Sequence, residues 1–153
     1  ADADYLWYEE PMREFSITAY QRLAERVDIP LLVAETSDGA HMNTADFITG
    51  GCAVGVRTST NLRGGITGAM RIAHLADAYL MRAEVHGGGL AHIHLCMAIR
   101  NNSYYESLIL TKPALREWCV DERGLVHAPQ SPGIGWEQLW EAQGAPAGVL
   151  AAV

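Results

Sequence analysis

Short apolar segments alternate regularly with amphipathic segments along this chain, and this alternation limits the folds that it can adopt. In four segments, apolar residues recur at the three- and four-residue spacing that is typical of a helix. The expected helices are 17–27, 43–51, 64–80 and 90–101, and the expected strands are 5–9, 31–35, 52–59, 81–86 and 103–110. Ser16 or Thr18 can cap the first helix, and Asn43 or Thr44 the second. Such alternation predicts a parallel sheet with crossover helices.

The spacing of the units indicates which parallel α/β fold is present. The polar residues at successive strand ends are 20 to 27 residues apart, and a (β/α)₈ barrel uses roughly 30 residues per unit. A doubly wound open sheet has a similar rhythm, but its glycine-rich phosphate loop follows a strand, whereas "GGCAVG" precedes one. We therefore expect part of a TIM-type barrel with about five βα units.

Polar side chains lie at the carboxyl end of each expected strand: Glu9, Glu35, Ser59, His86 and Glu106. Taken singly, a glutamate at a strand end is usually a solvated loop residue. In parallel α/β folds, however, the carboxyl ends of the strands carry the functional residues. The regular spacing of these five residues therefore favours a single site, which they share at the carboxyl ends of the strands (the mouth of the barrel). Several carboxylates in one mouth repel each other, and a hard cation with oxygen ligands, usually Mg²⁺, removes that difficulty.

Composition excludes several other classes of protein. The chain has 153 residues, 49% of them hydrophobic, and a net charge of -7, which argues for one globular domain and against a nucleic-acid surface. No segment reaches the roughly 20 apolar residues of a membrane span, and no signal peptide is visible. The cysteines Cys52, Cys96 and Cys119 are odd in number and widely spaced, so we expect buried free thiols and a cytoplasmic protein. His92 and His94 are expected to be packing or surface residues.

Several motifs, taken in order, resemble the enolase superfamily, in its mandelate racemase/muconate lactonizing enzyme-like branch. They are "WYEEP", "VAE", "GGITGA", "EVH", "YYES" and "GLVHAPQSPGIGW", which run from Tyr5 to Trp136. The resemblance implies a modified (β/α) barrel, of which this chain would hold strands four to eight in residues 1–112. Residues 113–153 would form a C-terminal tail that packs on the barrel or on a capping domain. The N-terminal half of the barrel and the capping domain would be missing, and the start at Ala1 fits a fragment.

The resemblance also implies roles for the strand-end residues. Glu9 and Glu35 would be ligands of Mg²⁺, and His86 a general acid or base. Glu106 would hydrogen-bond the substrate carboxylate, and Glu10 would support the metal ligands or bind substrate. Where the family usually has an Asp that pairs with the histidine, this chain has Ser59, which supplies a hydrogen bond but no charge.

The activity implied is that of a Mg²⁺-dependent acid-sugar dehydratase, which removes a proton alpha to a carboxylate and forms an enediolate. Sites of the enolase superfamily use a Lys or His base together with Mg²⁺. The alternatives are a racemase or cycloisomerase of the same superfamily, or an orphan half-barrel without catalysis. The expected partners are a sugar acid or other carboxylate, the missing N-terminal half, and other copies of the complete enzyme. The isolated chain is expected to be inactive.

Overall fold

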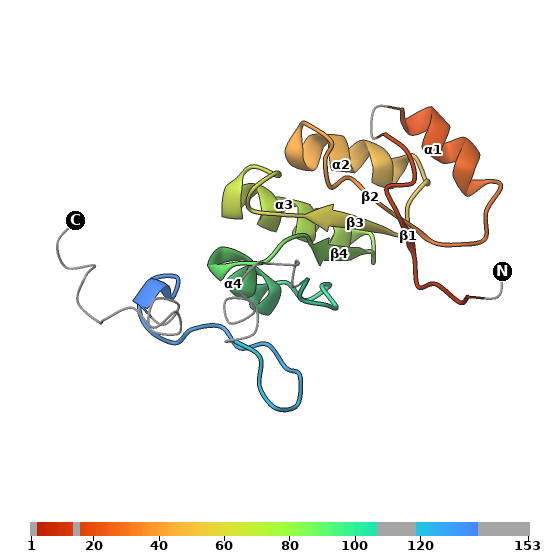
Figure 1. Cartoon of the computed structure of the whole chain (residues 1–153). Helices are drawn as coiled ribbons and strands as arrows, with labels where there is room; N and C mark the ends of the chain where they lie inside the picture. Colours follow the sequence, from red (N-terminus) through yellow and green to blue (C-terminus); the bar gives the residue numbers. More distant parts are fainter. Residues whose placement is uncertain (1–2, 14–15, 107–118, 138–153) are drawn as a thin grey trace.

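The computed structural model describes residues 3–13, 16–106 and 119–137 (Figure 1). Within these residues four strands alternate with four helices, which confirms the predicted alternation. In chain order the elements are β1 (Tyr8–Glu9), α1 (Ile17–Ala24), β2 (Leu31–Val33), α2 (Ala40–Thr49), β3 (Gly55–Thr58), α3 (Gly65–Ala78), β4 (Arg82–Val85) and α4 (Leu90–Ala98). The strands form one sheet in the order β1-β2-β3-β4, and every pair is parallel. The carboxyl ends of all four strands therefore lie along one edge.

Side-chain capping sets the start of α1 but not that of α2. Ser16 caps α1, because its Oγ accepts a hydrogen bond from the backbone N–H of Ala19 at 3.2 Å. Helix α2, however, begins at Ala40, so the prediction that Asn43 or Thr44 caps it is wrong. Gly39, with a φ of +87°, turns the chain into the helix earlier. Thr44 lies inside α2, where its hydroxyl donates to the carbonyl of Ala40 at 3.0 Å.

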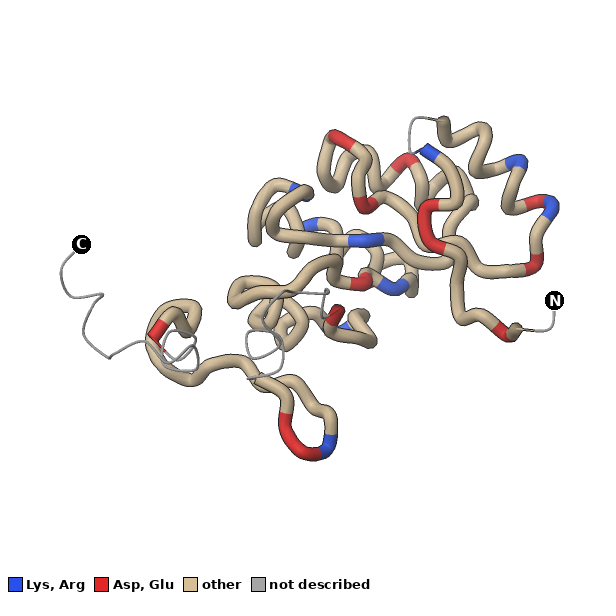
Figure 2. The backbone as a smooth tube through the Cα atoms, viewed as in Figure 1, with Lys and Arg blue, Asp and Glu red and all other residues tan. Residues whose placement is uncertain are grey.

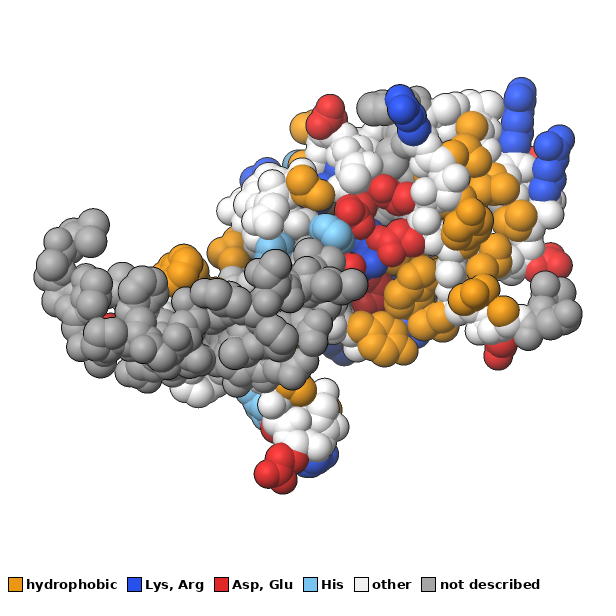
Figure 3. Space-filling view, viewed as in Figure 1, with side chains coloured by type: hydrophobic (Ala, Val, Ile, Leu, Met, Phe, Trp, Pro, Cys, Tyr) orange, Lys and Arg blue, Asp and Glu red, His pale blue; other side chains and the backbone are white. Residues whose placement is uncertain are grey.

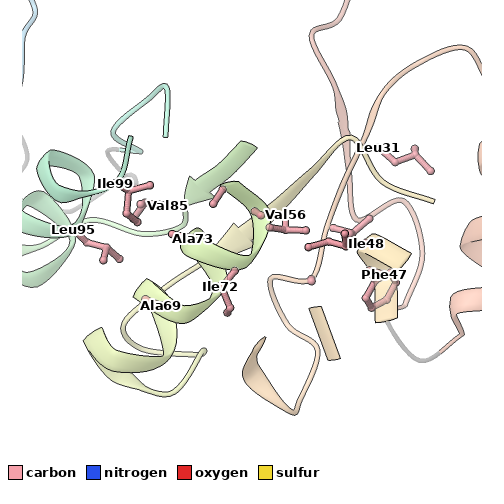
Figure 4. Close-up of a cluster of buried hydrophobic side chains, with 14 of the residues drawn as sticks. Leu31, Phe47, Ile48, Val56, Ala69, Ile72, Ala73, Val85, Leu95 and Ile99 are labelled. Carbon is pink, nitrogen blue, oxygen red and sulfur yellow. The ribbon is translucent and has the colours of Figure 1, made fainter. Parts of the chain in front are cut away.

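The main core lies between one face of the sheet and the helices (Figure 4). Val33, Val56 and Val85 come from three neighbouring strands and are fully buried in this cluster. Burial of a side chain of this size contributes about 1.5–3 kcal/mol. Tyr20 of α1 meets Phe47 of α2 edge-to-face, with ring centroids 5.5 Å apart. Because the helices cover one face of the sheet, polar residues occupy its other face and the carboxyl ends of its strands.

Strand alternation places charged side chains on the sheet face opposite the helices. Successive side chains of a strand point to opposite faces. Val56 and Thr58 of β3 face α3, and the Thr58 hydroxyl donates to the Ala69 carbonyl at 3.0 Å. Arg57 therefore points the other way, and its register partner Glu84 lies beside it on β4. Figure 2 shows this basic position on β3 among the acidic positions of the neighbouring segments.

A fifth strand at 103–110 is not seen in the part of that range that the structure describes. Residues 103–106 have no strand conformation, and 107–110 lie outside the described residues. The outer edge of β4 is instead partly paired by a loop: the Ala83 N–H donates to the Asn101 carbonyl at 3.0 Å, and the Val85 N–H to Asn102 Oδ1 at 2.9 Å. The expected boundary between barrel and tail at 112 also lies outside the described residues.

The described part of the tail, 119–137, extends past α4 and away from the sheet (Figure 1). It contains a small antiparallel bridge between Val120 and Val126. Cys119 in this segment, like Cys52 and Cys96, is a buried free thiol, which confirms that expectation. Within the described ranges, no helix is long and apolar enough to cross a membrane.

Candidate active site

Four of the predicted site residues meet at the carboxyl edge of the sheet. Glu9 ends β1, Glu35 lies just beyond β2, His86 directly follows β4, and Glu106 comes from the segment after α4. His86 Nδ1 lies 3.1 Å from Glu35 Oε2 and 3.1 Å from Glu106 Oε2. Figure 3 shows acidic side chains gathered at one place on this face, with a histidine beside them. Residues almost a hundred positions apart in the sequence thus form one polar cluster.

Arg57 occupies the middle of this cluster, and sequence reasoning did not single it out. Its Nε lies 2.5 Å from Glu9 Oε1, and its Nη2 lies 2.6 Å from Glu9 Oε2. Its Nη1 donates to the Val85 carbonyl at 3.3 Å and lies 3.4 Å from Glu106 Oε2. The two-point pairing with Glu9 is the strong, planar arrangement that guanidinium and carboxylate favour. The available signal in the sequence was an arginine within the apolar strand "GVRTS".

The cluster separates the pKa values of the two predicted metal ligands. Burial alone would raise the pKa of Glu9, but hydrogen bonds from Arg57 and Glu35 and the Arg57 charge bring it below its ordinary value. Glu35 goes the other way: burial, a hydrogen bond with Glu9 and the negative charges of Glu9 and Glu10 raise its pKa to about 8. Glu35 is therefore protonated at neutral pH when Arg57 is the nearby cation.

Glu9 and Glu35 are ligands of the type that a divalent metal prefers, but two side chains alone do not complete its coordination. Carboxylate oxygens are the ligands that Mg²⁺ prefers, and the two side chains are in hydrogen-bonding contact with each other. Burial, and then the neighbouring Glu9 and Glu10, raise the pKa of Glu35, so its charged form is disfavoured in this arrangement. Over the described part of the chain, no group of three or more His, Cys, Asp or Glu side chains is placed to hold a metal ion. These residues could therefore supply two ligands and would need others.

Glu10 binds the backbone of the loop that carries Glu35. Its Oε1 accepts hydrogen bonds from the backbone N–H groups of Glu35 and Thr36, at 2.5 and 3.1 Å. Its Oε2 accepts from the Thr36 hydroxyl at 3.2 Å. Glu10 thus ties the loop after β2 to the end of β1.

The Ser59 hydroxyl pairs with His92. It lies 3.2 Å from His92 Nε2 and accepts the backbone N–H of Asn61 at 3.2 Å. His92 is buried, at 3% exposure, and also receives the Thr60 N–H at 3.3 Å. Because that backbone group can only donate, Nε2 must be an acceptor, and His92 is a neutral ring.

Burial and the nearby His86 charge lower the pKa of His92, against opposing contributions from the Gly88 backbone and Glu106. A lowered pKa agrees with a ring that accepts the Thr60 N–H. His92 thus joins the loop after β3 to the glycine loop after β4, and packs against Gly87 and Gly89. The burial of His92 confirms the expectation that it is a packing residue. Its hydrogen bonds with Ser59 and Thr60 were not indicated by its spacing in the sequence. His94 is partly exposed, and its Nε2 lies 3.3 Å from the Ile134 carbonyl.

Glu106 completes the site by bonding the end of β4. Besides contacting His86, its Oε2 accepts the Gly87 N–H at 3.2 Å. Two carboxyl groups, those of Glu35 and Glu106, therefore face His86 Nδ1. The negative charge of Glu106 favours a proton on that nitrogen and leaves Nε2 to exchange protons with another molecule. The cluster as a whole can bind a cation, place a histidine beside it, and receive a small anionic or polar molecule at its mouth.

Comparison with known proteins places this geometry in a family. A family model described as enolase C-terminal domain-like matches residues 1–142. The crystal structure of D-glucarate dehydratase from Agrobacterium tumefaciens, complexed with magnesium, is 34% identical, with a TM-score of 0.80 over 86% of this chain. L-talarate dehydratase from Polaromonas sp. JS666, complexed with Mg and L-glucarate, is 26% identical, with a TM-score of 0.56 over 63% of this chain.

A curated relative belongs to the same group. L-talarate/galactarate dehydratase of Salmonella typhimurium is 26% identical over 145 residues. The present chain covers 36% of that protein, 37% of the Agrobacterium enzyme and 26% of the Polaromonas enzyme. It therefore spans about a third or less of the length of these relatives. Both of these solved enzymes are complexed with magnesium, and all three of these relatives are dehydratases of sugar acids.

Proposed function

The chain belongs to the enolase C-terminal domain-like family, and we propose that it is the C-terminal barrel portion of a Mg²⁺-dependent acid-sugar dehydratase. The observation that carries the proposal is the meeting of Glu9, Glu35, His86 and Glu106 at one edge of a parallel sheet. The proposed substrates are sugar diacids, because the similar enzymes are glucarate, talarate and galactarate dehydratases. Racemases and cycloisomerases remain the alternative within the same superfamily.

The proposed roles follow from the geometry of the side chains. Glu9 and Glu35 would hold Mg²⁺, with further ligands from a preceding portion of the polypeptide and from substrate. Bound there, the ion would stabilise negative charge that develops on a substrate carboxylate. His86 would exchange a proton at Nε2, because Glu35 and Glu106 face its Nδ1. Glu106 would also contact the carboxylate end of the substrate through its second oxygen.

The reaction proposed removes one molecule of water. The C–H bond alpha to the carboxylate breaks and its proton passes to a base. The electron pair forms a double bond to the β-carbon as the C–O bond there breaks, and the hydroxide leaves as water with a proton from an acid. From a 2,3-dihydroxy acid this gives a 2-hydroxy-2-enoic acid, which is an enol and tautomerises to the 2-keto-3-deoxy acid. His86 would serve as the acid that protonates the departing hydroxide.

Residues 1–112 would then be the partial barrel and 113–153 a tail that packs on the barrel or on a capping domain. The complete enzyme would be a homo-oligomer in the cytoplasm. The 153-residue chain alone would show no turnover, because two carboxylates are a poor Mg²⁺ cage.

The test is expression of this chain joined to the coding sequence that precedes Ala1 in its gene. With Mg²⁺, the product should convert D-glucarate, galactarate or L-talarate to a keto-deoxy acid. His86→Asn should lower kcat by about 10²-fold or more, whereas His74→Asn, at an exposed position of α3, should leave kcat unchanged. Failure to dehydrate any sugar acid, or full activity in His86→Asn, would contradict the proposal.

A further inference from the structure

Arg57 has the position that a bound cation would need. Its guanidinium lies among three carboxylates: Glu9 at 2.5 Å, Glu106 at 3.4 Å and Glu35 at 3.9 Å. Its side chain is only 7% exposed, whereas the side chains of Glu9 and Glu106 are 30% exposed. The arginine is thus the inner member of the cluster, and the carboxylates lie around it toward the mouth.

The pairing with Glu9 uses both oxygens of that carboxylate. Nε and Nη2 each direct a hydrogen bond to a separate oxygen, at 2.5 and 2.6 Å. A buried guanidinium that lost these acceptors would be left with unpaired donors, which is costly. Two anchors would remain, however, because Nη1 already lies 3.3 Å from the Val85 carbonyl and 3.4 Å from Glu106. Glu9 can therefore be released without leaving Arg57 entirely unpartnered.

Arg57 and a divalent metal ion need the same carboxylate. Mg²⁺ binds oxygen ligands at short distance in a near-ideal octahedral arrangement, whereas Arg57 now engages both oxygens of Glu9 in a flat fork. A second positive charge brought next to a guanidinium in a partly buried site is repelled by it if both stay in contact with the same carboxylate. When Glu9 is bound by either Arg57 or the metal ion, its binding by the other cation is therefore weakened.

We propose that Arg57 is an internal cation that competes with the divalent metal for Glu9, so that metal binding requires Arg57 to release this carboxylate. The inference rests on the proposed function, because it takes Glu9 and Glu35 as metal ligands. It adds a regulatory property of the same site: Arg57 holds the three acidic side chains together and lowers the affinity of the site for the metal.

The experiment measures Mn²⁺ binding to the purified chain by calorimetry and by the electron paramagnetic resonance signal of free Mn²⁺. Arg57→Met should bind Mn²⁺ at least about tenfold more tightly than the wild type. Arg57→Lys should be intermediate, since lysine keeps the charge but not the two-point pairing. Arg71→Met removes the same charge from an exposed position of α3 and should bind as the wild type does. In Arg57→Met/Glu35→Gln the gain should disappear.

A second measurement needs no substitution in the arginine. The Nε–H of Arg57 should give a hydrogen-bonded signal in ¹⁵N NMR of the wild type, and Mg²⁺ should shift it in proportion to occupancy. An unmoved signal at saturating Mg²⁺ would overturn the inference even if Arg57→Met does not fold. Equal or weaker Mn²⁺ affinity in folded Arg57→Met would also overturn it while leaving the proposed metal role intact. Absence of Mn²⁺ binding in every variant would also overturn the inference, because Arg57 would then have no metal ion to compete with at Glu9 in this chain.

Discussion

Glu10 holds the loop that carries Glu35: its Oε1 accepts the backbone N–H of Glu35 at 2.5 Å. The adjacent glutamates of "WYEEP" thus have separate tasks. Glu9 faces Arg57 at the mouth, and Glu10, with a φ of +36°, turns out of the strand and binds the neighbouring loop. A carboxylate that accepts two backbone N–H groups positions the next carboxylate along the sheet.

Glu10→Gln should therefore loosen the loop after β2. We expect a loss of about 1–2 kcal/mol in the free energy of unfolding, since charge-assisted hydrogen bonds are replaced by weaker ones. Mn²⁺ affinity should fall as well, because Glu35 is less well placed. Urea unfolding and calorimetry measure the two effects. Glu25→Gln, at an exposed position after α1, is the control, and equal behaviour of the two variants would contradict the assigned role.

The stability of the metal-free chain should depend on pH through Glu35. Its pKa rises from 4.5 to about 8 on folding, so the folded state holds a proton that the unfolded state releases. The stabilisation of the folded state by protonated Glu35 is fully present below about pH 4.5 and is lost as the pH rises through about 8. Urea unfolding across this window should show the decline in the wild type. Glu35→Gln should remove it, and Glu122→Gln, at an exposed position of the tail, should keep it.

Metal binding should release protons from the same residue. A carboxylate ligand must be ionised, and Glu35 is protonated at neutral pH in the metal-free chain. Saturating Mg²⁺ at pH 7 should therefore release about one proton per chain, measured by titration in weakly buffered solution. No release from the wild type, or an equal release from Glu35→Gln, would show that Glu35 is not the ligand.

His92 should contribute more to stability than His94 on the same helix. Replacing His92 with Phe leaves the Thr60 N–H and the Ser59 hydroxyl without their buried acceptor, at a cost of about 1–3 kcal/mol. His94→Phe should cost less, since that ring is partly exposed and makes one long contact with the Ile134 carbonyl. Thermal unfolding of the two variants gives the comparison, and a larger effect at His94 would refute it.

A carboxylate at position 59 should act on His92. Ser59→Asp would place a negative charge where the hydroxyl now lies 3.2 Å from His92 Nε2, which should raise the pKa of His92. Protonation of Nε2 would then oppose the Thr60 N–H and weaken the link between the two loops. Proton NMR titration of the imidazole signals measures the shift. If only the His86 signals move, Ser59 neighbours His86, as the sequence resemblance implies.

Local pattern determined much of this protein. The alternation of apolar runs and helical spacing predicted about five parallel βα units, of which four strands and four helices lie in the described residues. Ser16 was one of two predicted caps for the first helix, and it is the one observed. The proximity of Glu9, Glu35 and His86 was predictable because strand ends in a parallel sheet share one edge, so their order along the chain implies that they lie close together. Each of these inferences depends on residues a few positions apart, or on a rule that holds for every parallel sheet.

Only the tertiary structure decided which side chains touch. Arg57 and Glu9 are 48 positions apart, and nothing in the strand pattern says which cation fills the space between the carboxylates. Ser59 meets His92 because α4 buries that ring beneath the glycine loop, and β4 pairs with Asn101 and Asn102 instead of a described fifth strand. These partners depend on the depth and direction of side chains across separate elements, which sequence periodicity does not encode.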